Sequence, residues 1–267
     1  MPELPEVETI VRELWPILCG KTIEKIQVLW PRTVYNDEKG FTEALTNNPI
    51  VNVERRGKYI CLLLEKGETL TIHLRMTGKL VFQTAEKDLK HTRVILQFTD
   101  GAILYFIDTR KFGRMQLWPA TQPLLTGLGK EPLEEKTVFQ ALSVLKSRRA
   151  IKTILLDQRV LAGVGNIYAD EALFRAGIHP LTPAHKVSKP KLKKLSHHIP
   201  EILLAAIENK GTTISDYRRT DRQAGNNQSF LKVYGRHHQP CFTCQTPIVR
   251  LTINARGSHF CPKCQPA

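Results

Sequence analysis

The chain has 267 residues, 42% of them hydrophobic, and its formal net charge at pH 7 is +14. This length allows one large domain or two domains with hydrophobic cores, and the excess of cations indicates a polyanionic partner, nucleic acid before an acidic membrane. No apolar run reaches the roughly 18 residues of a membrane span, and no signal peptide opens the chain, so a membrane or secreted protein is not expected.

The first eight residues, Met-Pro-Glu-Leu-Pro-Glu-Val-Glu, hold two groups suited to chemistry. Removal of Met1 would leave Pro2 with a secondary α-amine, whose ordinary pKa of about 7.7–8.0 makes it a better nucleophile at neutral pH than a lysine. Glu3 follows as a carboxyl that can deliver a proton. The alternative is a frayed, inert terminus. Pro5 and the apolar residues that follow with a helical period predict a helix at the start of the chain.

The middle of the chain alternates between strand and turn signals. Eight strands are expected, at 22–28, 50–55, 59–65, 69–74, 78–82, 92–98, 102–107 and 114–118, with a helix near 40–47. Their number and spacing predict a β-sandwich. Residues 119–136 hold three prolines and two glycines without a clear period and are expected to form a linker. Helices are predicted after it at 138–147, 151–158, 167–176, 191–198 and 200–209.

Four cysteines stand in two Cys-x2-Cys pairs, Cys241 with Cys244 and Cys261 with Cys264. Four thiolates at this spacing are typical of a tetrahedral zinc site on a β-hairpin, and they leave no open position on the metal. We therefore predict one structural zinc ion. The residues between the two pairs would form the tip of the hairpin, which carries Arg256.

Three polar motifs interrupt the apolar patterns. Arg55-Arg56-Gly57-Lys58 precedes a strand, Asp108-Thr-Arg-Lys-Phe-Gly113 places cations beside an aromatic residue, and glycines precede Asn166 at the start of a predicted helix. A solvated strand edge would account for the first motif and a helix cap for Asn166. Alternatively, an enzyme that flips a base out of DNA plugs the gap with apolar wedges and an arginine, and glycines before a helix let backbone N–H groups approach a phosphate.

The chain resembles the formamidopyrimidine-DNA glycosylases, bifunctional repair enzymes that excise oxidised purines such as 8-oxoguanine. The resemblance covers essentially the whole chain and rests on PELPEVETIVREL at the start, RRGKY at 55–59, HLRMTG at 73–78, GVGNIYADE at 163–171 and the zinc hairpin. It implies an α+β fold with an N-terminal β-sandwich, a helix-two-turn-helix domain and a zinc-finger hairpin. Enzymes of the related endonuclease VIII type usually begin PEGPE, and Leu4 in place of that glycine favours the first group.

The resemblance also implies a catalytic scheme. Pro2 would attack C1′ of the damaged nucleotide while Glu3 protonates the oxygen of the sugar ring, and β- and δ-elimination would then cut the strand on both sides. Lys58 would assist elimination beside the amine. Arg256 would lie at the phosphates that flank the lesion and take part in the second elimination. No redox or nucleotide cofactor is needed in this scheme.

Further residues match positions that contact DNA in the family. Met76 would fill the gap left by the extruded nucleotide, although a methionine is also an ordinary core residue. Arg110 would meet the orphaned base, and Phe112 would wedge the base stack.

Two matches concern the DNA backbone. His91 corresponds to a histidine that contacts DNA, although Arg93 stands where the family commonly has a second histidine. Asn166 belongs to the element that grips the DNA backbone, and we expect it at the N-cap of its helix. The polar segment 212–230 is expected to be a long mobile loop at the place where the family covers the extruded base.

We therefore expect four segments: an N-terminal catalytic β-sandwich domain at 1–118, a linker at 119–136, a helical DNA-binding domain at 137–232, and a four-cysteine zinc-finger hairpin at 233–267. The implied partner is damaged double-stranded DNA, bound by a monomer without any membrane. The implied location is the cytoplasm of a bacterial-type cell, in association with the nucleoid.

Two alternative functions remain open. One is an endonuclease VIII-like glycosylase for oxidised pyrimidines, against which Leu4, Met76 and Phe112 argue. The other is a non-enzymatic zinc-ribbon DNA-binding protein, which would need the positive charge and the zinc hairpin but neither Pro2 nor Glu3.

Overall fold

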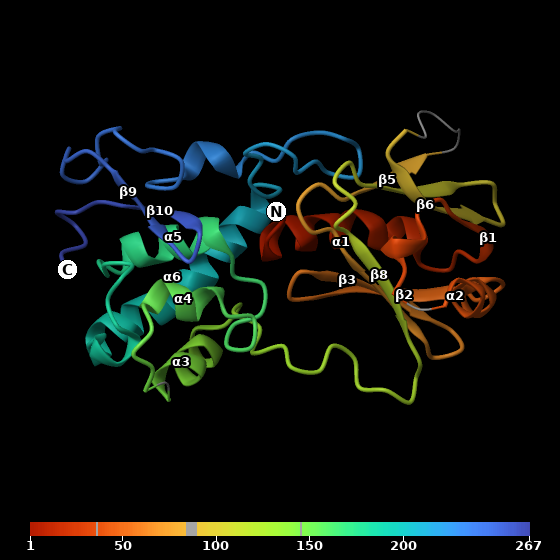
Figure 1. Ribbon diagram of the computed structural model, residues 1–267, viewed down its shortest axis with the longest axis horizontal. Coiled ribbons are helices and arrows are strands. Elements are labelled where there is room, and N and C mark those ends of the chain that lie inside the picture. The colour runs from red at the N-terminus through yellow and green to blue at the C-terminus, as the bar shows by residue number, and fades with distance from the viewer. Residues whose placement is uncertain (36, 84–89, 145) are drawn as a thin grey trace. The chain divides into compact units, whose positions relative to one another are not determined.

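The structure, a computed structural model, describes the chain except for residues 36, 84–89 and 145 (Figure 1). The chain divides into two compact units. The first comprises Met1–Thr126 and Asn209–Asn226, and the second comprises Gly127–Glu208 and Asn227–Ala267. Residues Asn209–Asn226, which the sequence analysis assigned to the helical domain, thus group with the first unit.

The first unit contains two antiparallel four-stranded sheets. One sheet has the order β1-β6-β7-β5, with β1 at Ile23–Val28, β6 at Thr92–Phe98, β7 at Ile103–Ile107 and β5 at Lys79–Gln83. The other has the order β2-β3-β4-β8, with β2 at Ile50–Arg56, β3 at Tyr59–Leu64, β4 at Thr69–His73 and β8 at Arg114–Trp118. All eight predicted strands are therefore present, each end within one residue of its predicted position.

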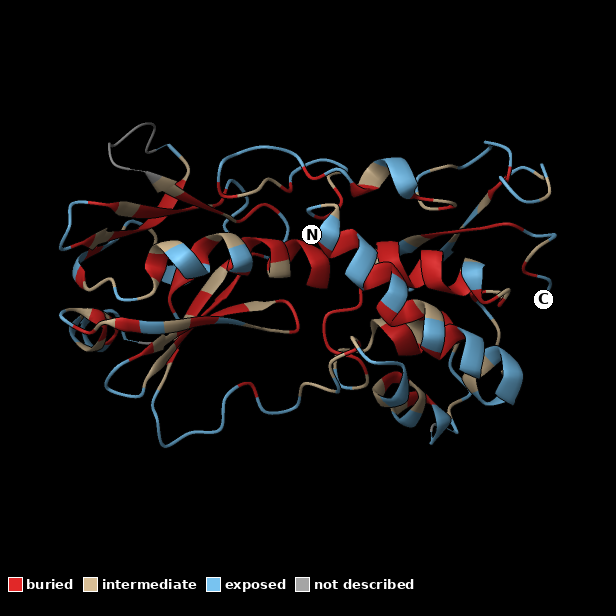
Figure 2. Ribbon diagram, turned by 180° about the vertical axis from the view of Figure 1, so that it is seen from behind, coloured by how far each residue is buried: buried red, intermediate tan, exposed pale blue. Residues whose placement is uncertain are grey.

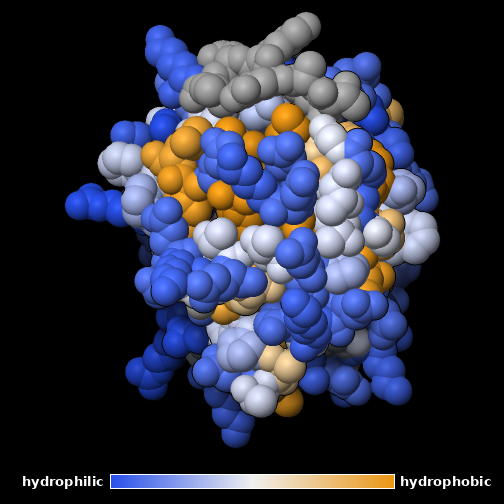
Figure 3. Space-filling model, turned by 90° about the vertical axis from the view of Figure 1, so that its right-hand side faces the viewer, coloured by the Kyte–Doolittle hydropathy of each residue, from blue (hydrophilic) through white to orange (hydrophobic). Residues whose placement is uncertain are grey.

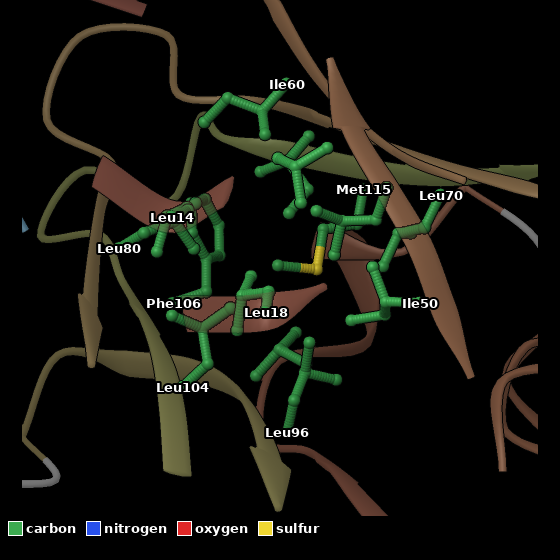
Figure 4. Packing of buried hydrophobic residues seen from close by; sticks show 14 of the residues in the cluster. Leu14, Leu18, Ile50, Ile60, Leu70, Leu80, Leu96, Leu104, Phe106 and Met115 are labelled. Carbon is green, nitrogen blue, oxygen red and sulfur yellow. The ribbon is translucent and has the colours of Figure 1, made fainter. Parts of the chain in front are cut away.

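A single hydrophobic core joins the two sheets, as expected for a β-sandwich, and helix α1 (Leu4–Leu18) lies between them (Figures 1 and 4). Leu14 and Leu18 of α1 pack with residues of both sheets, among them Ile50 and Leu96. Fully burying a leucine or isoleucine side chain stabilises a fold by roughly 1.5–3 kcal/mol, so this packing holds α1 firmly. The first turns of α1 are buried (Figure 2), and the N-terminal segment is therefore held by the core.

Among the described residues, two short elements remain in the first unit, and the elements of the second unit are mostly helical. The first unit also has α2 (Glu38–Leu45) and the 3-10 turn η1 (Pro31–Thr33). The second unit has α3 (Glu135–Ser143), α4 (Ile151–Leu156), α5 (Asn166–Arg175), η2 (Ala184–Lys186), α6 (Lys189–Glu208), η3 (Asn227–Phe230) and the hairpin of β9 (Val249–Ile253) and β10 (Arg256–Phe260).

The prediction of separate helices at 191–198 and 200–209 is wrong, because α6 runs through Pro200. Proline lacks an N–H, and its ring crowds the carbonyl four residues earlier, so its presence favoured a break in the sequence analysis. However, Leu195, Ile199 and Leu203 continue one buried stripe across the proline, and α6 packs against both α3 and α5. Burial of both halves on the same neighbours outweighs the lost hydrogen bond.

Most of the charged side chains lie at the surface. Figure 3 shows the end of the first unit that bears α2 and β1, where hydrophilic side chains predominate and hydrophobic ones show between them. Among the residues that the structure describes, no helix combines the length and the hydropathy needed to cross a membrane.

Candidate functional site

The N-terminal residues are buried at the start of α1. Pro2 is buried, and Glu3, which is only 3% exposed, occupies the N-cap position. The backbone N–H of Glu3 donates to Oε2 of Glu6 at 2.7 Å, and the two residues form a reciprocal capping box. The nitrogen of Pro2 is in a peptide bond with Met1 in this chain, so a free secondary amine requires removal of Met1.

Glu6 links this terminus to a distant part of the chain. Its Oε1 accepts a hydrogen bond from the backbone N–H of Thr212 at 2.8 Å, while its Oε2 holds Glu3. Gly211 has φ +78°, and a Cβ there would lie 3.1 Å from the Glu6 carboxylate, so the contact requires glycine. No sequence signal singles out Glu6, because an acid in the first turn of a helix is explained by the helix dipole alone.

Lys58 lies in the turn between β2 and β3 and is only 5% exposed. The side chain of the nearby Arg55 is only 6% exposed, and its Nε donates to Oε2 of Glu8 in α1 at 2.9 Å. Burial by itself raises the pKa of Glu8, but hydrogen bonds from Arg12 and Arg55 lower it below its ordinary value. The interpretation of this motif as a solvated strand edge is therefore wrong for Arg55 and Lys58.

His73 lies at the end of β4, within the HLRMTG motif at 73–78. It pairs across the sheet with Tyr59, and the two rings meet edge to face with centroids 4.6 Å apart. Burial, followed by the positive charges of Arg75 and Lys58, lowers the pKa of His73 to about 3. The ring is therefore neutral near pH 7. Because Nδ1 accepts the backbone N–H of Arg75 at 3.0 Å, the ring proton is on Nε2.

Asp108 joins two loops of the first unit. Its side chain is buried, and Oδ2 accepts the backbone N–H of Gly113 at 2.7 Å while Oδ1 accepts that of Arg110 at 3.2 Å. The hydroxyl of Thr77, in the other loop, hydrogen-bonds to the same carboxylate. A buried carboxylate that accepts several N–H and O–H groups fixes its partners, so Asp108 sets the position of residues 108–113 relative to 74–78.

These loops present the three residues expected to enter DNA. Met76 is 37% exposed and Phe112 is 48% exposed, which is too much for core residues. The guanidinium of Arg110 lies 4.9 Å from the centre of the Phe112 ring. The loop of Met76 is a tight turn, closed by Gly78 N–H to the carbonyl of Leu74 at 2.9 Å, and a Cβ on Gly78 would collide with that oxygen at 2.4 Å. The structure thus brings Met76, Arg110 and Phe112 onto neighbouring loops.

His91 lines a basic pocket of about 310 Å3 in the first unit. The lining residues are Lys79, Val81, His91, Ile107, Arg218, Arg219 and Arg222. Arg219 contacts Glu13 of α1 at 2.5 Å, which anchors the polar segment near residue 219. Arg93, where the family pattern has a histidine, is buried and donates from Nε to the carbonyl of Asp108 at 2.8 Å.

In the second unit, Asn166 contacts the zinc hairpin. Its Nδ2 donates to the carbonyl of Gly257 at 2.8 Å, and its buried Oδ1 has no hydrogen-bond partner among the described residues. The N-cap of α5 is Gly165, so the prediction of Asn166 as the N-cap is wrong by one residue. Arg256 is exposed at the start of β10, after a two-residue turn with positive φ at Asn254 and Ala255.

A buried ion pair contacts strand β10 of the zinc hairpin. Nζ of Lys152 in α4 lies 2.6 Å from Oδ1 of Asp170 in α5, and both side chains are fully buried. The same Nζ is 2.6 Å from Oγ of Ser258, and Oδ2 of Asp170 accepts the backbone N–H of His259 at 2.8 Å. No sequence signal points to this pair, because nothing in the local pattern distinguishes Lys152 from a surface lysine.

The four cysteines form one cluster whose sulfur atoms lie within 4.8 Å of one another. The Sγ atoms of Cys244 and Cys261 are 3.4 Å apart, and those of Cys241 and Cys264 are 4.0 Å apart. A tetrahedral zinc ion with Zn–S bonds of about 2.3 Å places its sulfurs about 3.8 Å apart, so the donor set fits zinc. Gln265 then joins the cluster to the segment that follows α5, because its Nε2 donates to the carbonyl of Ile178 at 2.8 Å.

Family models match three parts of the chain. Residues 1–115 match the formamidopyrimidine-DNA glycosylase N-terminal domain, residues 128–218 match the H2TH domain of the same enzymes, and residues 239–267 match a zinc finger found in FPG and IleRS.

Curated relatives match over nearly the full length. The formamidopyrimidine-DNA glycosylase of Ligilactobacillus salivarius (strain UCC118) is 44% identical over 272 residues, which cover 99% of both chains. That of Geobacillus kaustophilus (strain HTA426) is 41% identical over 274 residues, which cover 99% of this chain and 100% of the relative.

Solved structures agree with the fold. A Lactococcus lactis FPG variant in complex with a Fapy-dG containing DNA superposes with a TM-score of 0.92 at 36% identity, covering 100% of both chains. The Lactococcus lactis Fpg bound to an abasic site containing DNA gives a TM-score of 0.91 at 36% identity, covering 99% of this chain and 100% of the other. The wild-type protein bound to an oxidized pyrimidine containing DNA gives 0.90 at 36% identity, with full coverage of both chains.

Proposed function

This chain belongs to the formamidopyrimidine-DNA glycosylase family, and on that premise we propose which of its residues carry out the reaction. The chain is a base-excision-repair DNA glycosylase with lyase activity at abasic sites, and it contains a zinc-finger motif for one structural zinc ion. Its proposed substrates are oxidised purines, 8-oxoguanine and formamidopyrimidines, in double-stranded DNA.

In the proposed mechanism, the amine of mature Pro2 forms a bond to C1′ and the bond from C1′ to the damaged base breaks. Glu3 delivers a proton to the oxygen of the sugar ring, the ring opens, and an iminium joins enzyme and DNA. The observation that carries this proposal is the buried Glu3 at the N-cap, directly beside Pro2. The positive end of α1 favours a neutral amine there, because it disfavours a second cation.

The iminium acidifies the neighbouring sugar protons, and two eliminations then cut the strand. We propose that Lys58 assists elimination, which its burial in the first unit supports, since a buried cation attracts a phosphate strongly. Arg256 and Asn166 are proposed to hold the phosphates that flank the lesion, with Arg256 taking part in the second elimination. The contact of Asn166 with Gly257 supports a shared role for these two residues.

We further propose that Met76, Arg110 and Phe112 fill the gap that the extruded nucleotide leaves, with Arg110 facing the orphaned base. Their exposure and their support by Asp108 favour this role. His91 is proposed to contact the DNA backbone from its basic pocket.

The proposed partner is double-stranded DNA, bound by a monomer in the bacterial cytoplasm in association with the nucleoid. In this proposal, residues 1–118 carry out catalysis, residues 137–232 and 233–267 bind DNA, and residues 119–136 form the linker.

A second candidate substrate class is oxidised pyrimidines, because a Lactococcus lactis relative has been crystallised with an oxidized pyrimidine containing DNA. Competition between duplexes that carry 8-oxoguanine and an oxidised pyrimidine, in one nicking assay, ranks the two classes. Preference for the pyrimidine duplex would mean that oxidised purines are not the main substrate class.

The covalent step is tested by trapping. Borohydride reduces an iminium to a stable amine, so incubation with 8-oxoguanine duplex and borohydride should cross-link the enzyme, and peptide mapping should place the adduct on Pro2. The rival amine is Lys58, whose ordinary pKa of about 10.4 makes it far less reactive at neutral pH. An undamaged duplex is the substrate control.

Retention of Met1 or addition of an N-terminal tag should abolish trapping and nicking while DNA binding persists. An adduct on Lys58, or full activity with a blocked Pro2, would show that the assignment of the nucleophile is wrong.

A further inference from the structure

A pocket of about 560 Å3 lies in the second unit, and the proposed reaction uses none of its lining residues. Its wall includes the apolar residues Ile178, Leu181, Val187 and Pro266. Leu181 is 47% exposed, so the wall is open to solvent rather than part of the core. A concave apolar site of this size is typical of pockets that accept a ligand or a large side chain.

Two lysines line the same pocket, and three more lie close to them in sequence. Lys186 and Lys191 line it, and Lys189, Lys193 and Lys194 belong to the same segment of chain. Residues 184–200 contain no aspartate or glutamate. All five lysines are exposed, and within the part of the chain that the structure describes none of them makes an ion pair. Their charge is therefore available to an external anion.

We propose that this pocket binds an acidic peptide segment of a partner protein. In that segment, aspartates or glutamates flank a bulky apolar residue, whose side chain enters the pocket. The apolar wall would bury the side chain, and the lysines would attract the carboxylates and speed association. A DNA backbone is the rival occupant, because it also needs cations. Phosphates gain nothing from an apolar wall, however, so the combination of Leu181, Val187 and Pro266 with lysines favours the peptide.

The test uses a fluorescein-labelled peptide, Glu-Asp-Asp-Phe-Asp-Leu, and fluorescence anisotropy with the full-length protein. Saturable binding that weakens as salt rises is expected. Replacing Phe and Leu of the peptide with Ser should weaken binding by about tenfold or more, because the apolar contribution is lost. Lys186→Glu/Lys191→Glu should weaken binding by a similar factor, and so should Leu181→Asp, which retains every lysine.

The matched control is Lys39→Glu/Lys136→Glu, which changes two exposed lysines outside the pocket. Each Lys→Glu change removes two charges, so both double variants lower the formal net charge from +14 to +10. The control should bind the peptide within about twofold of the original chain, well below the tenfold effect that corresponds to about 1.4 kcal/mol. Nicking of an 8-oxoguanine duplex by every variant verifies that the enzyme is folded.

Three results would overturn the proposal. The first is the absence of saturable peptide binding, and the second is an equal loss in the control variant. The third is a pair of observations: undamaged duplex displaces the peptide, and Lys186→Glu/Lys191→Glu binds that duplex more weakly by the same factor as it binds the peptide. That last result would identify the lysines as a DNA-contacting surface.

Discussion

Glu3 and Glu6 are adjacent acids at one helix start, yet their carboxylates have different surroundings. Glu6 is occupied on both oxygens, by the backbone N–H groups of Glu3 and Thr212, and it holds the terminus in place. Glu3 is the carboxyl next to Pro2 and is the one assigned to proton delivery. At the scale of single residues, Glu6 supports the terminus, whereas Glu3 is the acid proposed to deliver the proton.

Glu3→Gln is expected to reduce base removal by about 10²–10⁴-fold, the range for loss of a general acid. Cleavage of a duplex with a pre-formed abasic site should be spared much more, because the abasic aldehyde already accepts the amine of Pro2. Single-turnover nicking of the two duplexes measures both steps. Equal losses on both substrates would contradict the role of Glu3 in base release.

His73 predicts a pH dependence of stability. Its pKa is about 3 in the folded chain against an ordinary value of 6.5. Between these values the unfolded chain binds a proton that the folded chain does not, so this group makes stability fall as the pH falls from 6.5 toward 3. His73→Gln keeps an acceptor for Arg75 and removes the effect.

The free energy of unfolding, measured in urea at several pH values between about 6 and 4, checks this. Other groups also titrate in this range, so only the difference between the original chain and His73→Gln is informative. The original chain should lose about 1.4 kcal/mol more per pH unit than His73→Gln in this window. Parallel pH profiles for the two proteins would mean that His73 is protonated normally in the folded state.

At the scale of elements, contacts from several parts of the second unit hold the zinc hairpin. The four cysteines enclose the metal position, Gln265 binds the carbonyl of Ile178, and the pair of Lys152 and Asp170 reaches Ser258 and His259. A two-stranded hairpin alone is marginally stable in water, so these contacts are needed to place Arg256.

Cys261→Ser should abolish high-affinity zinc binding, because the binding free energy of a structural zinc is also folding free energy. The hairpin should loosen, and DNA affinity and nicking should fall while the β-sandwich stays folded. Zinc content, DNA titration and circular dichroism measure the three effects. Cys19→Ser, outside the cluster, is the control, and DNA affinity of the original strength in Cys261→Ser would contradict the prediction.

At the scale of the whole molecule, the charge of +14 predicts binding that depends steeply on salt. Each neutralised phosphate contributes about −0.9 to the slope of log K against log salt, because condensed counterions are released. Several contacts should therefore give a slope steeper than about −2, measured by anisotropy with labelled duplex across a salt series. A shallower slope would mean that most of the basic residues do not face the DNA.

The sequence by itself determined every strand of the sandwich, the α1 helix and the zinc ligands. Short strand-like runs, turn residues and Cys-x2-Cys spacing are local signals, since they follow from backbone geometry and metal coordination. The motifs around Pro2, Lys58 and Asn166 were also visible, because they stand out against these patterns. Family resemblance, rather than spacing, supplied their roles.

Only the tertiary structure decided the parts that depend on contacts between distant residues. Glu6 reaches Thr212 across 206 positions, and Lys152 reaches Ser258 across 106, so no window of sequence contains either pair. The continuity of α6 through Pro200 was decided in the same way, by burial on α3 and α5. The physical reason is common to all three: burial and long-range hydrogen bonds belong to the folded chain, whereas propensity and spacing are already present in the unfolded one.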